Sequence, residues 1–129
     1  MKKKILPGKT RTIGPYSQGV KIEAKELVFI SGQVPEDEQG NVVGKRDIEV
    51  QARQVMENLK AMMASAGGSL NDIAKLTILL TDMKFYDAVS KIRYEYFRND
   101  FPAATLFEVK SLAKKDWLLE IEAIAVLSK

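Results

Sequence analysis

Two glutamates with a single residue between them interrupt an otherwise apolar run near the end of the chain. If Leu118 to Val126 forms a strand, its side chains alternate between two faces, so Glu120 and Glu122 share one face. The opposite face is wholly apolar and suits packing under helices: Leu119, Ile121, Ala123 and Ala125. Carboxylates on an apolar strand are costly unless they meet water, a ligand or a cation. The pair therefore indicates either a half-exposed sheet face with acids in solvent, or an acid held in a cleft for proton transfer.

Two residue types that often carry catalysis are missing from the sequence. The 129 residues include no cysteine and no histidine. This excludes disulfides, thiol nucleophiles, Cys-type zinc sites and every Ser-His or Cys-His arrangement. Acid–base chemistry would have to come from Asp, Glu, Tyr, Lys or ordered water. We expect neither a metal nor a cofactor.

The length and composition are those of one soluble globular domain over residues 1–129. Hydrophobic residues make up 46% and charged residues 29% of the chain, and no apolar run approaches the ~20 residues of a membrane helix. The basic start is followed by an apolar segment that Pro7 and Gly8 end at once, which is too short for a signal peptide. We therefore expect a cytoplasmic protein with no membrane partner. The net charge of +3 comes without a basic stripe interleaved with aromatic residues, so nucleic acid is not the expected partner.

One long segment has clear helical periodicity. From Asp47 to Ala66 apolar residues recur at helical spacing, with Asp47 as the N-cap and Gly67 in a left-handed position after the end. The predicted apolar stripe consists of Ile48, Ala52, Val55, Leu59, Met62 and Ala66.

A second helix is predicted over Lys84 to Phe97, with Asp82 as its cap. Its predicted buried stripe consists of Phe85, Val89, Ile92 and Tyr96. Ser90 and Arg93 lie three residues apart and therefore occupy neighbouring positions on another face.

Four short runs rich in apolar residues predict strands, over residues 27–30, 73–81, 103–110 and 118–126. Residues 1–20 contain several prolines and glycines and are predicted as extended chain and turns. Two halves of strand–helix–strand character predict an α+β fold with a mainly antiparallel sheet and two helices on one face. The second face mixes Thr, Glu and apolar residues, which suits burial against other subunits with clefts between them.

A bend at Gly14 and Pro15 could present Tyr16 and Ser17 at a surface, or could simply pack Tyr16 onto the core. The strand over residues 27–30 ends at Ser31-Gly32, where a glycine lets a backbone or ligand approach closely.

Four segments together resemble one family. They are Ile-Gly-Pro-Tyr-Ser-Gln-Gly (13–19), Ser-Gly-Gln-Val-Pro (31–35), Gln-Ala-Arg-Gln-Val-Met-Glu-Asn-Leu-Lys (51–60) and Glu-Ile-Glu-Ala-Ile-Ala (120–125). In this order and spacing the chain resembles the reactive-intermediate deaminase family, RidA/YjgF, once described as translation-initiation inhibitors. The resemblance implies a chorismate-mutase-like fold and a homotrimer whose sheets line a central barrel, with three ligand clefts at the subunit interfaces.

The resemblance also implies a chemistry and a site. Deaminating relatives hydrolyse 2-imino or enamine acids to keto compounds, and the family acid, which corresponds to Glu120, is thought to activate the attacking water. The family tyrosine corresponds to Tyr16, which would line the cleft. The strand-end glycine matches Gly32, beside Ser31, near the substrate carboxylate. A lone carboxylate in a semi-apolar cleft has a raised pKa and can exchange protons with water near neutral pH.

One departure from the family pattern affects substrate binding. Active relatives carry Pro-Ala-Arg before a small polar residue, and that arginine clamps the substrate carboxylate. Here Ala104 takes the arginine's place, followed by Thr105, and Ser90 takes the place of the family's helical asparagine. The turn before Glu120 is also about one residue longer. Arg93, one helical turn from Ser90, is the nominated replacement cation, and its alternative interpretation is a solvated helix charge.

Three functions stay open at this point. The chain could hydrolyse imines with altered specificity, or it could bind a small 2-imino or 2-keto acid without turning it over. RNA binding or cleavage, suggested by the family's older name, is the third, although no stacking platform or basic groove is evident.

Overall fold

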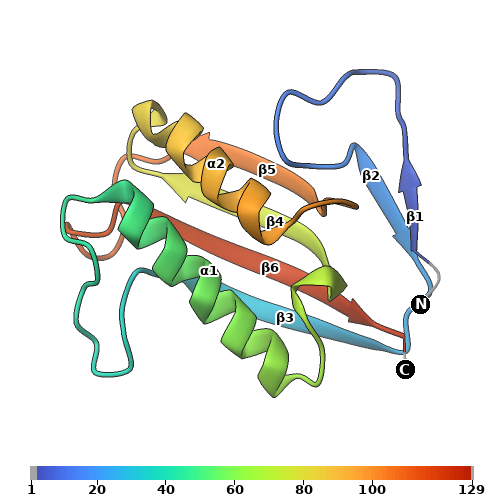
Figure 1. Ribbon diagram of the computed structural model, residues 1–129, viewed down its shortest axis with the longest axis horizontal. Coiled ribbons are helices and arrows are strands. Elements are labelled where there is room, and N and C mark those ends of the chain that lie inside the picture. Colours follow the sequence, from blue (N-terminus) through green and yellow to red (C-terminus); the bar gives the residue numbers. More distant parts are fainter. Residues whose placement is uncertain (1–2, 129) are drawn as a thin grey trace.

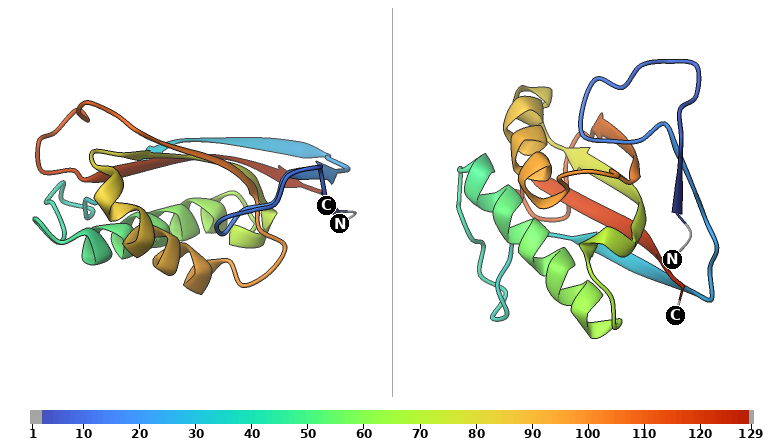
Figure 2. Two further views of the ribbon diagram at one scale, coloured as in Figure 1. Left: turned by 90° about the horizontal axis from the view of Figure 1, so that it is seen from above. Right: turned by 45° about the vertical axis from the view of Figure 1, so that its right-hand side comes forward.

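The computed structural model describes residues 3–128, and its centre is a four-stranded sheet with two helices on one face (Figure 1). The strand order is β3-β6-β4-β5, with only β4 and β5 parallel. The strands are β3 (Glu26–Gln33), β4 (Ile73–Leu80), β5 (Ala103–Glu108) and β6 (Leu119–Leu127), and the helices are α1 (Ile48–Ser65) and α2 (Tyr86–Tyr96). Figure 2 shows both helices on the same side of the sheet. The predicted α+β architecture is confirmed.

The core lies between this sheet and the two helices. On β6 the predicted apolar face is buried against the helices: Leu119, Ile121, Ala123 and Ala125 are each at most 4% exposed. Their partners on β4 include Leu80, Ile78 and Leu76, which are also fully buried. Strand alternation therefore fixes which face of β6 carries the two glutamates.

Helix α1 has the predicted ends but a slightly different buried stripe. The Asp47 side chain accepts a hydrogen bond from the Val50 N–H at 3.2 Å, and Gly67 follows the helix with φ of +83°. The placement of Met62 in the core was wrong, because Met62 is 41% exposed and Met63 is fully buried instead. The stripe turns gradually around the axis, since 3.6 residues per turn does not match a fixed spacing of three or four.

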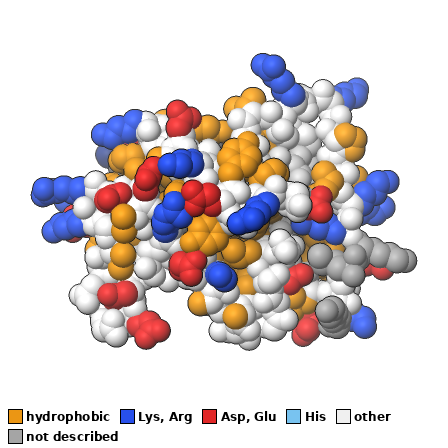
Figure 3. All heavy atoms as spheres, viewed as in Figure 1, with side chains coloured by type: hydrophobic (Ala, Val, Ile, Leu, Met, Phe, Trp, Pro, Cys, Tyr) orange, Lys and Arg blue, Asp and Glu red, His pale blue; other side chains and the backbone are white. Residues whose placement is uncertain are grey.

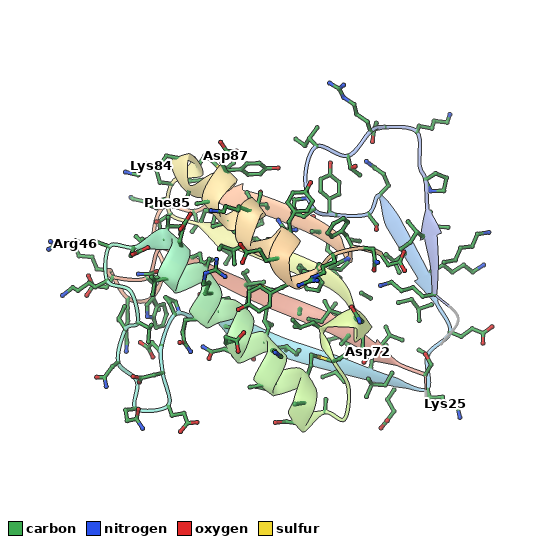
Figure 4. The ribbon with its side chains drawn as sticks, viewed as in Figure 1. Lys25, Arg46, Asp72, Lys84, Phe85 and Asp87 are labelled. Atoms are coloured by element: carbon green, nitrogen blue, oxygen red, sulfur yellow. The ribbon has the colours of Figure 1, made fainter. Side chains whose placement is uncertain are left out.

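Helix α2 is shorter than predicted and has a tighter entry. The Asp82 carboxylate accepts from the Lys84 N–H at 2.8 Å and caps a short 3₁₀ turn, η2 (Met83–Phe85), before the α-helix begins at Tyr86. Figure 4 labels Lys84, Phe85 and Asp87 at this end of the helix. The predicted cap is therefore right, but it belongs to the 3₁₀ turn.

The start of the chain pairs into strands that the sequence did not reveal. Strands β1 (Lys3–Leu6) and β2 (Gly19–Ile22) form a separate antiparallel sheet to the side of the main one, as Figure 1 shows. The connecting loop returns to the core at Ser17, which is 8% exposed and whose hydroxyl donates to the Phe101 carbonyl. A surface position for Ser17 was therefore wrong, since this hydroxyl anchors the loop beside β5.

A 3₁₀ turn, η1 (Leu70–Asp72), precedes β4, and Ser69 is its N-cap: the Ser69 N–H donates to the Asp72 carboxylate at 2.8 Å. Asp72 is labelled in Figure 4. Among the helices of residues 3–128, neither is long and apolar enough to cross a membrane.

Candidate functional site

The carboxylate of Glu120 lies on the sheet face that the helices leave open, directly against Gly32 of β3. Glu120 pairs with Leu79 of β4, and the regular pairing of β3 with β6 is interrupted between Ile30 and Gln33, next to Gly32. A Cβ added to Gly32 would lie only 1.8 Å from Glu120 Oε2. The absence of a side chain at Gly32 is therefore what allows this carboxylate to take its place. Ser31 lies beside it and is exposed.

Partial burial alters the acidity of Glu120. Burial raises its pKa above the usual range, and the negative charge of Glu122, two residues along the same face, raises it further. Among the residues that the structure describes, no cation forms an ion pair with Glu120. Such a carboxylate can both take a proton from water and return it.

A second group of candidate residues surrounds a pocket of about 350 Å³ at the edge strand β5. The N-terminal loop, η2, α2 and β5 all contribute to its lining: Ile13, Tyr16, Met83, Tyr86, Arg93, Ala104, Thr105 and Leu106. Three residues nominated from the sequence, Tyr16, Ala104 and Thr105, and the nominated cation Arg93 therefore line one cavity. Met83, Tyr86 and Leu106 were missed, because only the family pattern pointed to this region and that pattern does not include them.

Arg93 is buried, so its interpretation as a solvated helix charge was wrong. Arg93 is only 2% exposed, and its Nη2 donates to the Pro15 carbonyl at 3.0 Å. The N-terminal loop thus closes over this face of α2. Burial lowers the pKa of Arg93 to about 10, partly offset by Tyr86 and Tyr94, so the guanidinium is protonated at neutral pH.

Two polar atoms on this face of α2 are buried without a hydrogen-bond partner in the described part of the chain. They are Ser90 Oγ and Arg93 Nε, and both residues lie on the helix face that the Ile13-Gly14-Pro15 segment approaches. Ser90 is 7% exposed and lines a neighbouring hollow of about 560 Å³ with Ile13 and Gly14. Buried polar atoms in native proteins normally have partners, so each unpartnered one requires an explanation.

On β5, Ala104 and Leu106 of the pocket face the side of the sheet opposite to Glu120, whereas Thr105 lies on the face of Glu120. On β5, Ala104 pairs with Leu76, and Leu76 is buried under the helices, whereas Phe107 pairs with Leu79 on the face of Glu120. Strand alternation therefore directs Ala104 toward α2 and Glu120 away from it. Within one chain the structure brings Glu120 to Gly32, and Tyr16 to Arg93 and Ala104, but it does not bring the two groups together.

The open face of the sheet is markedly apolar around Glu120. Its exposed hydrophobic side chains are Leu27 (57%), Phe29 (73%), Phe107 (45%) and Ile124 (37%). Thr105 shares this face, where the Lys75 ammonium donates to its hydroxyl at 2.9 Å. Apolar patches of this kind usually mark an interaction surface. Within residues 3–128 there is no cluster of acidic side chains that could hold a metal ion.

A family model and sequence relatives both match nearly the whole chain. The model of the family described as Endoribonuclease L-PSP matches residues 8–127. A RutC family protein from Pyrococcus horikoshii is 46% identical over 115 residues, which are 89% of each chain.

Solved structures agree with this match. A Rid family protein of Yersinia pestis, YyfB, has a TM-score of 0.90 at 28% identity, covering 98% of this chain and 100% of that one. RidA from an Antarctic Psychrobacter has a TM-score of 0.74 at 35% identity, covering 91% of this chain and 92% of that one. A structure from Thermotoga maritima titled a putative endoribonuclease has a TM-score of 0.75 at 38% identity, with coverage of 92% and 91%.

Proposed function

The chain belongs to the RidA/YjgF family, and from this premise we propose that it hydrolyses small 2-imino or enamine acids to 2-keto acids and ammonia. The observation that carries the proposal is the position of Glu120, an acid with a raised pKa that lies against Gly32 on an apolar sheet face. No cofactor is required, because the carboxylate and water supply all the protons that the reaction moves.

Glu120 acts first as a base and then as an acid. Its carboxylate takes a proton from water as the oxygen bonds to the imine carbon and the C–N π electrons move to the nitrogen, and the carboxyl group then returns that proton to the nitrogen. In the resulting carbinolamine the same carboxylate takes the hydroxyl proton and passes it to the amino group. The C–N bond breaks, ammonia leaves with the bonding electron pair, and the oxygen electrons form the carbonyl group. An enamine enters the same route after protonation at its β-carbon. Burial raises the pKa of Glu120, which makes its carboxylate a stronger base for taking the proton from water.

The complete cleft forms between copies of the chain. The face of Glu120 in one copy covers the β5 pocket of its neighbour, because Ala104 and Glu120 of one chain point to opposite sides of the sheet and cannot meet within that chain. Exposed Phe29 and Leu27 supply the apolar contact that such an interface needs. The assembly is a homotrimer, in keeping with the family resemblance, and closed rotational symmetry gives three equal clefts.

The direct test measures the imine itself. An amino-acid oxidase generates a 2-imino acid in the presence of semicarbazide, and the protein should lower the yield of semicarbazone. Glu120→Gln should abolish this effect while the circular dichroism spectrum stays unchanged. Full activity in Glu120→Gln would remove Glu120 from the mechanism.

Glu122→Gln is the matched variant, because Glu122 is exposed on the same strand face. It should keep the hydrolysis but shift its pH profile to lower pH, because removing the Glu122 charge lowers the pKa of Glu120. A protein that binds the keto acid but leaves the semicarbazone yield unchanged is a ligand-binding trimer and not a hydrolase.

The family description raises ribonuclease activity, but no feature of the described residues favours it. Basic and acidic side chains are intermixed over the helices, as Figure 3 shows for that face. Two of the basic side chains on this face form ion pairs between the helices, Arg53 with Glu95 and Lys91 with Glu49. RNA binding that persists at physiological salt would be the result that revives this function.

A further inference from the structure

The buried charge of Arg93 lacks a counterion. No carboxylate among the described residues forms an ion pair with it, and its Nε has no hydrogen-bond partner. Within residues 3–128 its hydrogen-bond partner is the neutral carbonyl of Pro15. Removing a cation from water without pairing it costs several kcal/mol. An anion that entered the pocket would supply the counterion that this guanidinium lacks.

The position of this charge is specific. Arg93 and Ala104 line the same pocket of about 350 Å³, one from α2 and the other from β5. Ala104 is small and points toward the helices, so it leaves room beside the guanidinium. A larger side chain at position 104 would enter the space in which an anion must lie.

We propose that Arg93 binds the carboxylate of a small 2-keto or 2-imino acid in this pocket, as the helix-borne replacement for a strand-borne arginine at position 104. The inference rests on the proposed function for the identity of the acid, but not for the presence of the anion site. The planar guanidinium can grip a carboxylate through two parallel N–H donors, which a lysine could not do.

The rest of the lining restricts the size and polarity of the acid. Met83, Tyr86 and Leu106 surround the guanidinium with largely apolar surface, and Tyr16 contributes a second ring. The Tyr16 hydroxyl accepts from the Ile13 N–H at 3.3 Å, which holds the ring in place. The pocket therefore suits a monocarboxylate with a short apolar side chain, and a second charged group on the ligand would have no partner here.

The test uses 2-oxobutanoate as a stable probe and compares it with its uncharged methyl ester by calorimetry on the full chain. The wild type should bind the acid at least about tenfold more tightly than the ester. Arg93→Gln should remove this preference, while Arg98→Gln, an exposed arginine two residues beyond α2, should keep it. An Arg93→Gln protein with wild-type preference for the acid would overturn the inference, as would phosphate binding as tight as that of the acid.

A second variant covers the case in which Arg93→Gln does not fold. Ala104→Glu places a carboxylate in the pocket, where it should pair with Arg93, raise Tm above that of Ala104→Gln near neutral pH, and abolish binding of the acid. The Tm difference should disappear when the new carboxyl is protonated. Equal Tm values for the two variants at every pH would contradict the inference.

The outcomes separate this inference from the proposed function. If 2-oxobutanoate binding depends on Arg93 but no imine is hydrolysed, the anion site stands and the hydrolase does not. If Glu120-dependent hydrolysis continues in Arg93→Gln with unchanged KM, the hydrolase stands and the anion site does not.

Discussion

The Glu120 carboxylate and the Gly32 backbone occupy adjoining space, so that a single methyl group at position 32 would overlap the carboxylate oxygen at 1.8 Å. The two residues come from neighbouring strands, β6 and β3, at the point where their regular pairing is interrupted. Gly32 therefore sets the position of the acid, and the acid is the only group on this face to which we assign proton transfer.

Gly32→Ala should reduce imine hydrolysis by at least about a hundredfold, a loss typical of a misplaced general base. The Glu120 side chain can swing toward solvent, so the fold should survive. Semicarbazone trapping measures the activity and circular dichroism the fold. Gly19→Ala in β2 is the matched control, because its new Cβ comes no closer than 3.3 Å to Leu6. Normal activity in Gly32→Ala would show that the position of the carboxylate does not matter.

Glu120→Gln should raise Tm near neutral pH. Because the pKa of Glu120 is raised in the folded protein, the folded state keeps a proton that the unfolded chain has already released. The contribution of Glu120 to the free energy of unfolding therefore falls as the pH rises through its pKa in the folded protein. Glutamine does not ionise, so the Glu120→Gln variant does not lose this free energy. The Tm difference should shrink as the pH falls below about 4, where Glu120 becomes protonated in the unfolded chain as well as in the folded one. A lower Tm for Glu120→Gln across this range would contradict the sign of the shift.

Binding of 2-oxobutanoate should weaken at high pH. The pKa of Arg93 is lowered to about 10 by burial, so its charge is intact at neutral pH and is lost progressively above that value. Affinity should be constant from about pH 7 to 9 and fall beyond about 10, with a slope of about tenfold per pH unit. Circular dichroism at each pH confirms that the chain is folded. Affinity that stays level to about pH 11 in the folded protein would exclude a titrating cation in the site.

Gln51→Leu should cost about 2–4 kcal/mol of unfolding free energy. Gln51 is fully buried on α1, and its amide donates to the Gly44 and Asp116 carbonyls at 3.1 and 2.9 Å. Its carbonyl accepts from the Leu118 N–H at 2.9 Å. Leucine fills the space but leaves these backbone groups unpaired.

Urea unfolding measures this loss, and Gln39→Leu in an exposed loop is the control. Because Gln51 anchors the segment that leads into β6, activity should fall with stability. A change smaller than about 0.5 kcal/mol would show that water replaces the lost partners.

Features set by local rules could be predicted from the sequence. Asp47 and Gly67 are recognisable helix ends because capping depends on one residue type at one position. The buried and open faces of β6 follow from strand alternation alone, which assigned Glu120 and Glu122 to the face away from the helices. Resemblance to the RidA/YjgF family supplied the assignment of residues to a site.

Features that depend on distant contacts could not be predicted. Burial of Arg93 requires the loop at Pro15, 78 residues away, to close over α2, and no local pattern encodes that contact. The pairing of β1 with β2 joins segments separated by a loop rich in glycine and proline. Family resemblance also groups position 104 with Glu120 in one cleft, whereas only the sheet register shows that Ala104 and Glu120 face opposite sides of one chain.

The central claim is that each cleft takes Glu120 from one copy and Arg93 from its neighbour. Glu120→Gln and Arg93→Gln, each inactive alone, should therefore restore activity when mixed and allowed to exchange subunits. Random exchange at equal amounts leaves about one quarter of the clefts with both wild-type residues. Native mass spectrometry verifies that mixed assemblies have formed. Recovery of about one quarter of the wild-type rate is the predicted result, and mixed assemblies with no activity would contradict the shared cleft.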